Sequence, residues 1–133
     1  MARRARDAPA EEGCAMFEMK FAAEGGGLVA ELSGRLDARS APDFERDALA
    51  AADGLERERG MLLDLSRLEY ISSAGLRSIL LLARRLSGSG GRVVLCGMSG
   101  VVKEVFDISG FDSFLPVASG RDEGLSLLSG RGA

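Results

Sequence analysis

Apolar and polar positions alternate along residues 17–21, which predicts a half-buried strand near the start of the chain. Three glycines at 25–27 follow as a turn, and residues 28–32 supply an antiparallel partner strand. Gly34 and Asp37 are then expected in the loop that follows this hairpin.

The next segment has apolar residues at helical spacing, from a cap at Ser40 to a stop near 53–54. Two short continuous apolar runs, 61–65 and 92–96, are typical of strands that are covered on both faces. Between them lies a second helical pattern, which begins around Ser73 and ends near residue 86. Strand, helix and strand in this order indicate a right-handed parallel crossover.

The remaining pattern completes a small fold. Ser99 can begin a third helix that ends at Gly110, with four apolar residues facing inward: Val101, Val102, Val105 and Phe106. Residues 114–117 form a short edge strand because Pro116 cannot donate to a strand ladder, and residues 121–128 form a final helix. The predicted fold is α/β, with a small, mixed and mostly parallel sheet, an N-terminal antiparallel hairpin and packed helices.

The chain of 133 residues is long enough for one domain, which we place at residues 16–129. Residues 1–15 are small or charged and show no periodicity, so they predict a flexible N-terminal tail, and residues 130–133 form a C-terminal tail. The apolar surface expected outside the core is small, which predicts a monomer or a weak dimer.

Composition and charge argue against several classes of function. A net charge of −3 and a pI near 5.1 do not fit a nucleic-acid binder, and no apolar run approaches the ~18 residues of a membrane span. The two cysteines, Cys14 and Cys96, fit a reducing cytoplasm and no disulfide framework. The chain has no histidine, so the common metal sites lack ligands and we expect no cofactor.

Two features that could suggest an enzyme do not support one. The segment Gly88–Gly91 follows a helix and precedes a strand, whereas a phosphate loop follows a strand and opens a helix. Asp37 and Asp64 could form a carboxylate pair, but the chain has no histidine to act with them. We therefore expect a protein without enzymatic activity.

The helix that begins near Ser73 has two distinct faces. Its core face gathers six residues: Leu76, Ile79, Leu80, Leu82, Ala83 and Leu86. The opposite face carries Ser73, Arg77, Leu81 and Arg84, so one leucine stands among polar residues on the side that should meet water. Leu81 is either a tolerated exposed leucine or part of a stripe that contacts a partner, and the pattern leaves both open.

Two adjacent hydroxyl residues, Ser72 and Ser73, stand where this helix begins. Backbone N–H groups at a helix N-terminus favour an anion, and Arg77 lies one turn further along. A phosphate on Ser73 would add about −1.5 to −2 charges at a position suited to receive them. On these residues alone, two helix caps are the simpler interpretation.

From about Phe17 to Leu128 the chain resembles the STAS family, and within it the small bacterial anti-sigma factor antagonists. The resemblance rests on these motifs: Gly34-Arg35-Leu36-Asp37, Asp64-Leu65-Ser66, Tyr70-Ile71-Ser72-Ser73-Ala74-Gly75-Leu76, Val94-Leu95-Cys96-Gly97 and Val105-Phe106-Asp107-Ile108-Ser109-Gly110-Phe111. The family commonly has Asp-Ser-Ser or Asp-Ser-Thr before the glycine of the third motif, and the hydroxyl residue after the aspartate is phosphorylated. That residue corresponds to Ser73, with Ser72 in place of the aspartate and Ala74 in place of the second hydroxyl residue.

The resemblance implies a non-enzymatic partner switch in the bacterial cytoplasm. The unphosphorylated protein would bind a serine kinase that is also an anti-sigma factor, the kinase would phosphorylate Ser73, and a serine phosphatase would reset the protein. Ser72 and Gly75 belong to the motif at the helix start. Together with the helix face described above, the resemblance predicts partner contacts at Asp37, Ser73, Arg77, Leu81 and Arg84.

Two alternatives stay open within the same family resemblance. The chain could be a STAS module of another system, such as a secretion regulator or a lipid-transport accessory subunit. It could also be a nucleotide-binding STAS domain, although no phosphate loop supports that function.

Overall fold

The computed structural model describes residues 2–3, 16–24, 27–55 and 59–128. The elements follow in the order β1 (Ala2–Arg3), β2 (Glu18–Glu24), β3 (Gly27–Leu36), α1 (Ala41–Asp53), β4 (Met61–Ile71), α2 (Ser73–Ser87), β5 (Val93–Cys96), α3 (Gly100–Ser109), the 3-10 helix η1 (Phe111–Ser113), β6 (Val117–Ala118) and α4 (Arg121–Leu128). The strands lie side by side in chain order, from β1 at one edge of the sheet to β6 at the other.

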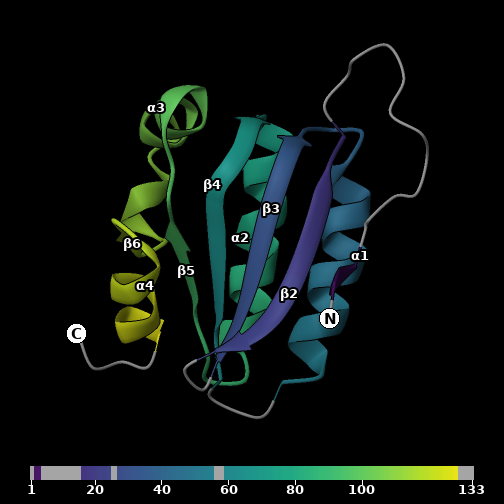
Figure 1. Cartoon of the computed structure of the whole chain (residues 1–133), viewed down its shortest axis with the longest axis vertical. Helices are drawn as coiled ribbons and strands as arrows, with labels where there is room; N and C mark the ends of the chain where they lie inside the picture. Colours follow the sequence, from purple (N-terminus) through teal and green to yellow (C-terminus); the bar gives the residue numbers. More distant parts are fainter. Residues whose placement is uncertain (1, 4–15, 25–26, 56–58, 129–133) are drawn as a thin grey trace.

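The sheet is mixed, as the sequence predicts. β2 pairs antiparallel with β1 on one side and with β3 on the other, whereas β3, β4, β5 and β6 pair in parallel. Figure 1 shows α1 and α2 next to each other behind the strands, with α3 at one end of the sheet and α4 beside β5 and β6. The predicted α/β class, the hairpin and the packed helices are confirmed.

The core has two parts because the central strands are covered on both faces. The larger part lies between the sheet and the helices α1, α2 and α3, and it includes Leu32, Leu63 and Leu95 from neighbouring strands. A smaller cluster lies under α4: Val29, Leu62, Val94, Cys96, Ala118 and Leu128. Successive strand residues point to opposite faces, so burial on both sides explains the continuous apolar runs of β4 and β5.

Two strands are longer than the sequence pattern predicts. β3 includes Gly34, which was expected in a loop, and β4 continues to Ile71 beyond the predicted end at Leu65. The backbone at Gly34 has a φ of +87°, and a Cβ there would lie 1.8 Å from the Met16 carbonyl oxygen. Glycine alone accepts both conditions, so β3 passes Met16, shifts register against β4 and stays paired to Leu36.

The start of α1 differs from a simple capped helix. Ser40 precedes the helix as predicted, but its hydroxyl forms no bond to the N–H groups of the first turn. It donates instead to the Arg35 carbonyl at 2.7 Å and accepts from the Asp37 N–H at 3.0 Å. Ser40 therefore closes the turn between β3 and α1. This role could be predicted only with the knowledge of where β3 ends.

The apolar surface is larger than the sequence suggests. In the part of the chain that the structure describes, the exposed large apolar residues are Leu81, Val101, Ile108, Phe114 and Val117. Val101 was expected to face inward on α3 but is 48% exposed, because the buried stripe of that helix runs through Val102 and Phe106, with Val105 partly buried against the core. The predicted monomer or weak dimer stays a prediction.

Part of the predicted N-terminal tail has a place in the sheet. Ala2 and Arg3 form β1 and pair with Lys20 and Met19. Residue 1, residues 4–15 and the predicted C-terminal tail lie outside the described residues. The boundaries of the domain therefore stay a prediction.

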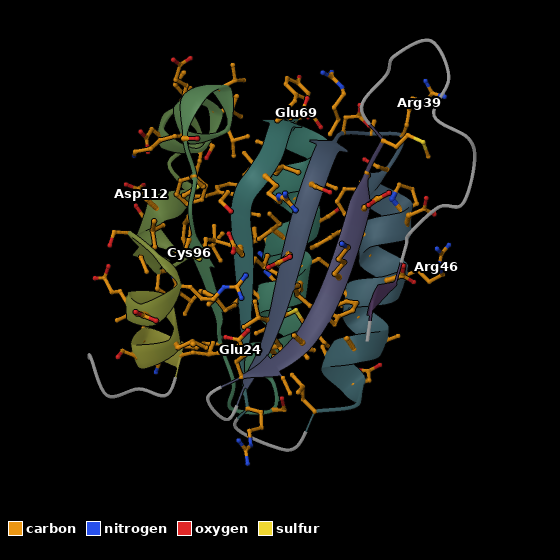
Figure 2. All side chains as sticks on the ribbon, viewed as in Figure 1. Glu24, Arg39, Arg46, Glu69, Cys96 and Asp112 are labelled. Carbon is orange, nitrogen blue, oxygen red and sulfur yellow. The ribbon has the colours of Figure 1, made fainter. Side chains whose placement is uncertain are left out.

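One arginine joins α4 to the central strands. The guanidinium of Arg121 donates to Glu24 at 3.0 Å, to Asp64 at 2.7 Å and to Glu31, so it links β2, β4 and β3. Figure 2 shows Glu24 at the end of the sheet where β2 meets β3. These contacts hold α4 over the smaller part of the core.

The same cluster sets the ionisation of its neighbours. Burial disfavours the charged form of Asp64, but hydrogen bonds from Arg121 and from Ser66 outweigh it, so the pKa of Asp64 is lowered. Burial and the nearby Asp64 carboxylate raise the pKa of the Cys96 thiol to about 11. Cys96 is therefore a protonated core residue at neutral pH.

Asp64→Asn tests the contribution of this cluster to stability. A carboxylate with a lowered folded pKa stabilises the protein above about pH 3.9, the unfolded aspartate value, and this contribution disappears as the pH falls through the folded pKa. We expect the variant to lose about 1–2 kcal/mol at pH 7 and to lose less stability than wild type between about pH 5 and pH 2. Urea unfolding at a series of pH values measures both effects. Asp122→Asn, an exposed residue of α4, is the control, and identical pH profiles for wild type and Asp64→Asn would contradict the prediction.

Candidate functional site

The start of α2 is fixed to the end of β3 by backbone and side-chain contacts of Ser72. Its N–H donates to the Leu36 carbonyl at 2.9 Å, and its own carbonyl accepts from the Leu76 N–H at 3.0 Å. The Ser72 hydroxyl accepts from the Gly75 N–H at 3.2 Å. Ser72 is therefore the N-cap residue of α2, as the sequence predicts.

Gly75 lets the first turn of α2 rest directly on β3. A Cβ at this position would lie 2.7 Å from the Leu36 carbonyl oxygen and 2.9 Å from Leu36 Cγ. Any side chain here would push the helix off the strand, because the obstructing atom belongs to the backbone of Leu36. A backbone atom cannot move aside as the end of a flexible side chain can. The glycine of the motif therefore sets the distance between helix and sheet.

Ser73 differs from Ser72 in its exposure to solvent and in the hydrogen bonding of its hydroxyl. It is the first residue of α2 and is exposed. Its hydroxyl forms no hydrogen bond with the residues that the structure describes, whereas the Ser72 hydroxyl is engaged in the cap. The fold thus uses one hydroxyl and leaves the other accessible at a helix N-terminus.

The predicted outer face of α2 is exposed as a whole. Ser73, Arg77, Leu81 and Arg84 all point to solvent, and Leu81 is 44% exposed. Leu76, Ile79, Leu82 and Leu86 are buried, and Leu80 and Ala83 are half-buried. Arg77 and Arg84 form no ion pair within the described parts of the chain, whereas Arg85 pairs with Asp53 at 2.7 Å. We call the four exposed residues Ser73, Arg77, Leu81 and Arg84 the α2 face.

Asp37, also predicted to contact a partner, has a defined place in the turn after β3. Its Oδ1 accepts from the N–H groups of Arg39 at 3.0 Å and Ser40 at 3.3 Å. Its Oδ2 lies 3.8 Å from Nε of Arg35. The carboxylate therefore helps to shape the turn that lies next to the start of α2. In Figure 2, Glu69 and Arg39 mark this end of the sheet.

Sequence reasoning missed Ser78, which is only 1% exposed. Its hydroxyl lies within hydrogen-bond distance of a Glu45 carboxylate oxygen and of the Ala74 carbonyl. The contact to Glu45 joins α2 to α1. A serine on the core side of a helix gives no sign of such a partner until the two helices are placed together, because Glu45 lies 33 positions away.

The described residues contain no cluster of histidine, cysteine, aspartate and glutamate that could hold a metal ion. No helix in the described ranges is long and apolar enough to cross a membrane. The chemistry available at the start of α2 is therefore that of an exposed hydroxyl beside two arginines and a leucine.

Comparison with known proteins identifies the class to which this arrangement belongs. The family model described as "Mlab, STAS domain" matches residues 19–117. This range includes β3, β4 and β5, the start of α2 and the α2 face. The chain belongs to the STAS domain family, as the motifs predict.

Particular relatives narrow the class. The chain is 46% identical over 97 residues to BtrV of Bordetella bronchiseptica, named as a candidate anti-sigma factor antagonist, with 73% of this chain and 82% of that protein covered. An anti-sigma factor antagonist from Mycobacterium paratuberculosis has the same fold, with a TM-score of 0.76 at 19% identity over 85% of this chain and 94% of that one. The comparison thus confirms the predicted family of antagonists.

The antagonist SpoIIAA matches in two solved forms. The unphosphorylated form has a TM-score of 0.68 at 22% identity and covers 86% of this chain and 97% of that one. The phosphorylated form, from Bacillus, has a TM-score of 0.60 at 21% identity and covers 84% of this chain and 98% of that one. Both forms of SpoIIAA have the same fold as this chain.

Ser72→Ala tests whether the Ser72 hydroxyl stabilises the start of α2. Removal of an N-cap hydroxyl leaves a backbone N–H of the first turn without its partner, and we expect a loss of about 1 kcal/mol of unfolding free energy. Ser87→Ala, at the exposed last position of the same helix, is the matched control and should cost nothing. Urea unfolding measures both variants. Equal stability of Ser72→Ala and wild type would show that the cap bond does not hold the helix start.

Proposed function

We propose that this chain is a non-enzymatic anti-sigma factor antagonist that binds an anti-sigma factor serine kinase in the cytoplasm and is released when Ser73 is phosphorylated. The observation that carries the proposal is the exposed Ser73 hydroxyl at the start of the α2 face, which forms no hydrogen bond within the described ranges. The relative BtrV and the existence of SpoIIAA in phosphorylated and unphosphorylated forms support it.

The α2 face suits a reversible contact with a protein partner. Leu81 provides apolar area, and Arg77 and Arg84 provide charges without ion-pair partners among the described residues. Arginine and leucine side chains in this arrangement can bury their carbon atoms and still donate hydrogen bonds to acidic groups of a partner. A partner with an apolar pocket and acidic rim would complement the face.

Phosphorylation would act on this contact through charge. In the transfer, the Ser73 oxygen bonds to the γ-phosphorus of ATP, the bond to the ADP oxygen breaks, and the hydroxyl proton is lost. The product carries about −1.5 to −2 charges at the edge of the contact face. Binding would then require removing water from a dianion, which is costly unless the partner supplies a matching cation. Arg77, one turn along α2, can pair with the phosphate within the protein itself.

A complete cycle requires a second partner. A serine phosphatase would hydrolyse the phosphate and return the α2 face to its binding form. The antagonist itself would need no cofactor, bind neither nucleic acid nor membrane, and act as a monomer or weak dimer.

Leu81→Ala separates binding from folding. A buried leucine costs about 2–5 kcal/mol when truncated to alanine, whereas Leu81 is 44% exposed and should cost well below that range. We expect partner affinity to fall by about tenfold or more. Val117→Ala, whose side chain is 41% exposed on β6, is the matched control and should leave affinity unchanged. Titration calorimetry and urea unfolding measure the two effects, and a large loss of stability with unchanged affinity would place Leu81 in the core.

Charge at Ser73 should regulate binding. Ser73→Ala should leave the fold and the kinase complex intact, because the hydroxyl forms no hydrogen bond with the described residues. Ser73→Glu should weaken the complex and leave the fold unharmed, since an acidic residue near a helix N-terminus is favourable by roughly 0.3–1 kcal/mol. Ser73→Gln has the same size as the glutamate without its charge, and it should bind more tightly than Ser73→Glu. Equal affinities of the glutamate and glutamine variants would show that charge does not control the contact.

Recovery of the partner tests the proposed function as a whole. A second candidate is that this chain serves as a STAS module of another system, because the family model that matches it is described as a STAS domain and names no anti-sigma factor. Capture of partners from lysate with wild type and with Leu81→Ala as the control, followed by mass spectrometry, distinguishes the two. An anti-sigma factor kinase that is lost with Leu81→Ala supports the antagonist, and a transport or secretion component in its place contradicts it.

A further inference from the structure

The face of the sheet opposite α1 and α2 is covered over only part of its area. Figure 1 shows β2, β3 and β4 in front of α1 and α2, with α4 to one side. α4 covers the smaller part of the core, which lies towards β5 and β6. The parallel pair β3 and β4 continues beyond α4 with polar residues on this face. Parallel strands are normally covered on both faces, so a partner could supply the layer that is missing here.

Sheet register gathers these polar residues. Arg35, Arg67 and Tyr70 each precede a residue of the larger core, so their own side chains point to the opposite face. Ser33 pairs with Arg67, and Arg35 pairs with Tyr70. Lys20 of β2 lines one hollow together with Ser33 and Arg67. We call these five residues, Lys20, Ser33, Arg35, Arg67 and Tyr70, the open face.

The cations of the open face have few contacts of their own. Lys20 and Arg67 are exposed and form no ion pair with the residues that the structure describes. Arg35 is 47% exposed, and its Nε lies 3.8 Å from the Asp37 carboxylate, which is a weak pair between partly exposed groups. The Arg35 guanidinium carbon lies 4.3 Å from the centre of the Tyr70 ring. Arginine and tyrosine are enriched among the residues that dominate binding at protein interfaces.

The carboxylates on this side of the sheet leave an excess of positive charge at the end away from α4. Glu31 and Asp64, at the α4 end, are bound by Arg121. At the other end the carboxylates are those of Glu18 and Asp37, and backbone N–H groups of its own turn hold Asp37. The cations of the open face outnumber these two groups. Charge complementarity therefore favours an acidic partner.

The shape of the open face suits a chain segment and not a small molecule. The hollow has a volume of about 50 Å³, far below the ~300 Å³ of a small-molecule site. Arg35 lies two residues beyond the partner of Arg67 on the neighbouring strand, which places the two Cα atoms about 8 Å apart. Side chains at alternate positions of an extended chain lie about 7 Å apart on one side. The two arginines thus match acidic side chains at alternate positions of an extended segment.

We propose that the open face binds an extended acidic segment of a partner protein. Arg35 and Arg67 pair with carboxylates at alternate positions of that segment, and the Tyr70 ring packs against its backbone. This inference goes beyond the proposed function and does not depend on it, because the α2 face lies on the other side of the sheet. The chain can therefore hold two partners at once, one on each side of the sheet.

A synthetic ten-residue peptide in which glutamate alternates with serine is the probe. The chain has one tyrosine and no tryptophan, so intrinsic fluorescence of the full chain reports on Tyr70 alone. We expect a saturable change in this signal, with an affinity that falls about threefold or more between about 0.05 and 0.3 M salt. Amide NMR signals of Ser33, Arg35 and Arg67 should shift in the same titration.

Charge-removing variants locate the contact. Arg35→Gln and Arg67→Gln should each weaken peptide binding by about fivefold or more, since each removes a charge-assisted hydrogen bond. Arg35→Lys should restore part of the loss, because lysine keeps the charge but not the planar donor group. Arg92→Gln is the matched control: Arg92 is exposed, has the same charge and lies just before the start of β5. It should leave the affinity unchanged, and urea unfolding checks that every variant keeps its fold.

Three results would overturn the proposal. One is equal peptide affinity of Arg67→Gln and Arg92→Gln. Another is binding of a serine–lysine peptide or of a ten-nucleotide oligothymidine as tightly as the glutamate peptide, which would remove the preference for an acidic protein segment. The third is a shift of the same NMR signals on dilution of the protein alone, which would assign the open face to a second copy of the chain.

Discussion

Where β4 gives way to α2, the N–H of Ser72 donates to the carbonyl of Leu36, and this contact sets the position of the helix on the sheet. It is possible only because Gly75 has no side chain, so that the first turn can lie against the strand backbone. Both conditions depend on β3 reaching Leu36 in register with Ile71. The positive φ and the register shift at Gly34, where the strand passes the Met16 carbonyl, are therefore part of the same constraint.

The properties of the α2 face follow from that placement. The inner side of the helix is packed against the core, so the opposite side faces solvent with Ser73, Arg77, Leu81 and Arg84. The Ser72 hydroxyl is engaged by the Gly75 N–H, whereas the Ser73 hydroxyl is exposed and forms no hydrogen bond with the described residues. A modification there would change the charge of an exposed face without disturbing the contacts that hold it.

Local pattern was enough to predict most of the fold. Alternation of apolar and polar residues near Phe17 and Met19 predicted the hairpin, and helical spacing of apolar residues after Ser73 predicted α2. Both patterns depend only on residues that are close together in the chain. The outer face of α2 was predicted from the helical rotation of 100° per residue. The STAS motifs then suggested which residues of this face contact a partner. These predictions needed no knowledge of what packs against the helix.

Contacts between distant parts of the chain could not be predicted in this way. Arg121 meets Asp64 from 57 positions away, and Ser78 meets Glu45 from 33 positions away. Gly34 was placed in a loop because nothing in its neighbourhood reveals the Met16 carbonyl beside it. Arg35 and Tyr70 were visible as parts of two family motifs, but only the pairing of β3 with β4 brings them together.

The central claim is that the fold occupies one serine and leaves its neighbour available for modification. Phosphopeptide mass spectrometry of the protein after incubation with its cognate kinase and ATP tests this claim most directly, with Ser72→Ala and Ser73→Ala treated in parallel. The account predicts one phosphate on Ser73 in wild type and in Ser72→Ala, and none in Ser73→Ala. Phosphate mapped to Ser72, or persisting in Ser73→Ala, would contradict it.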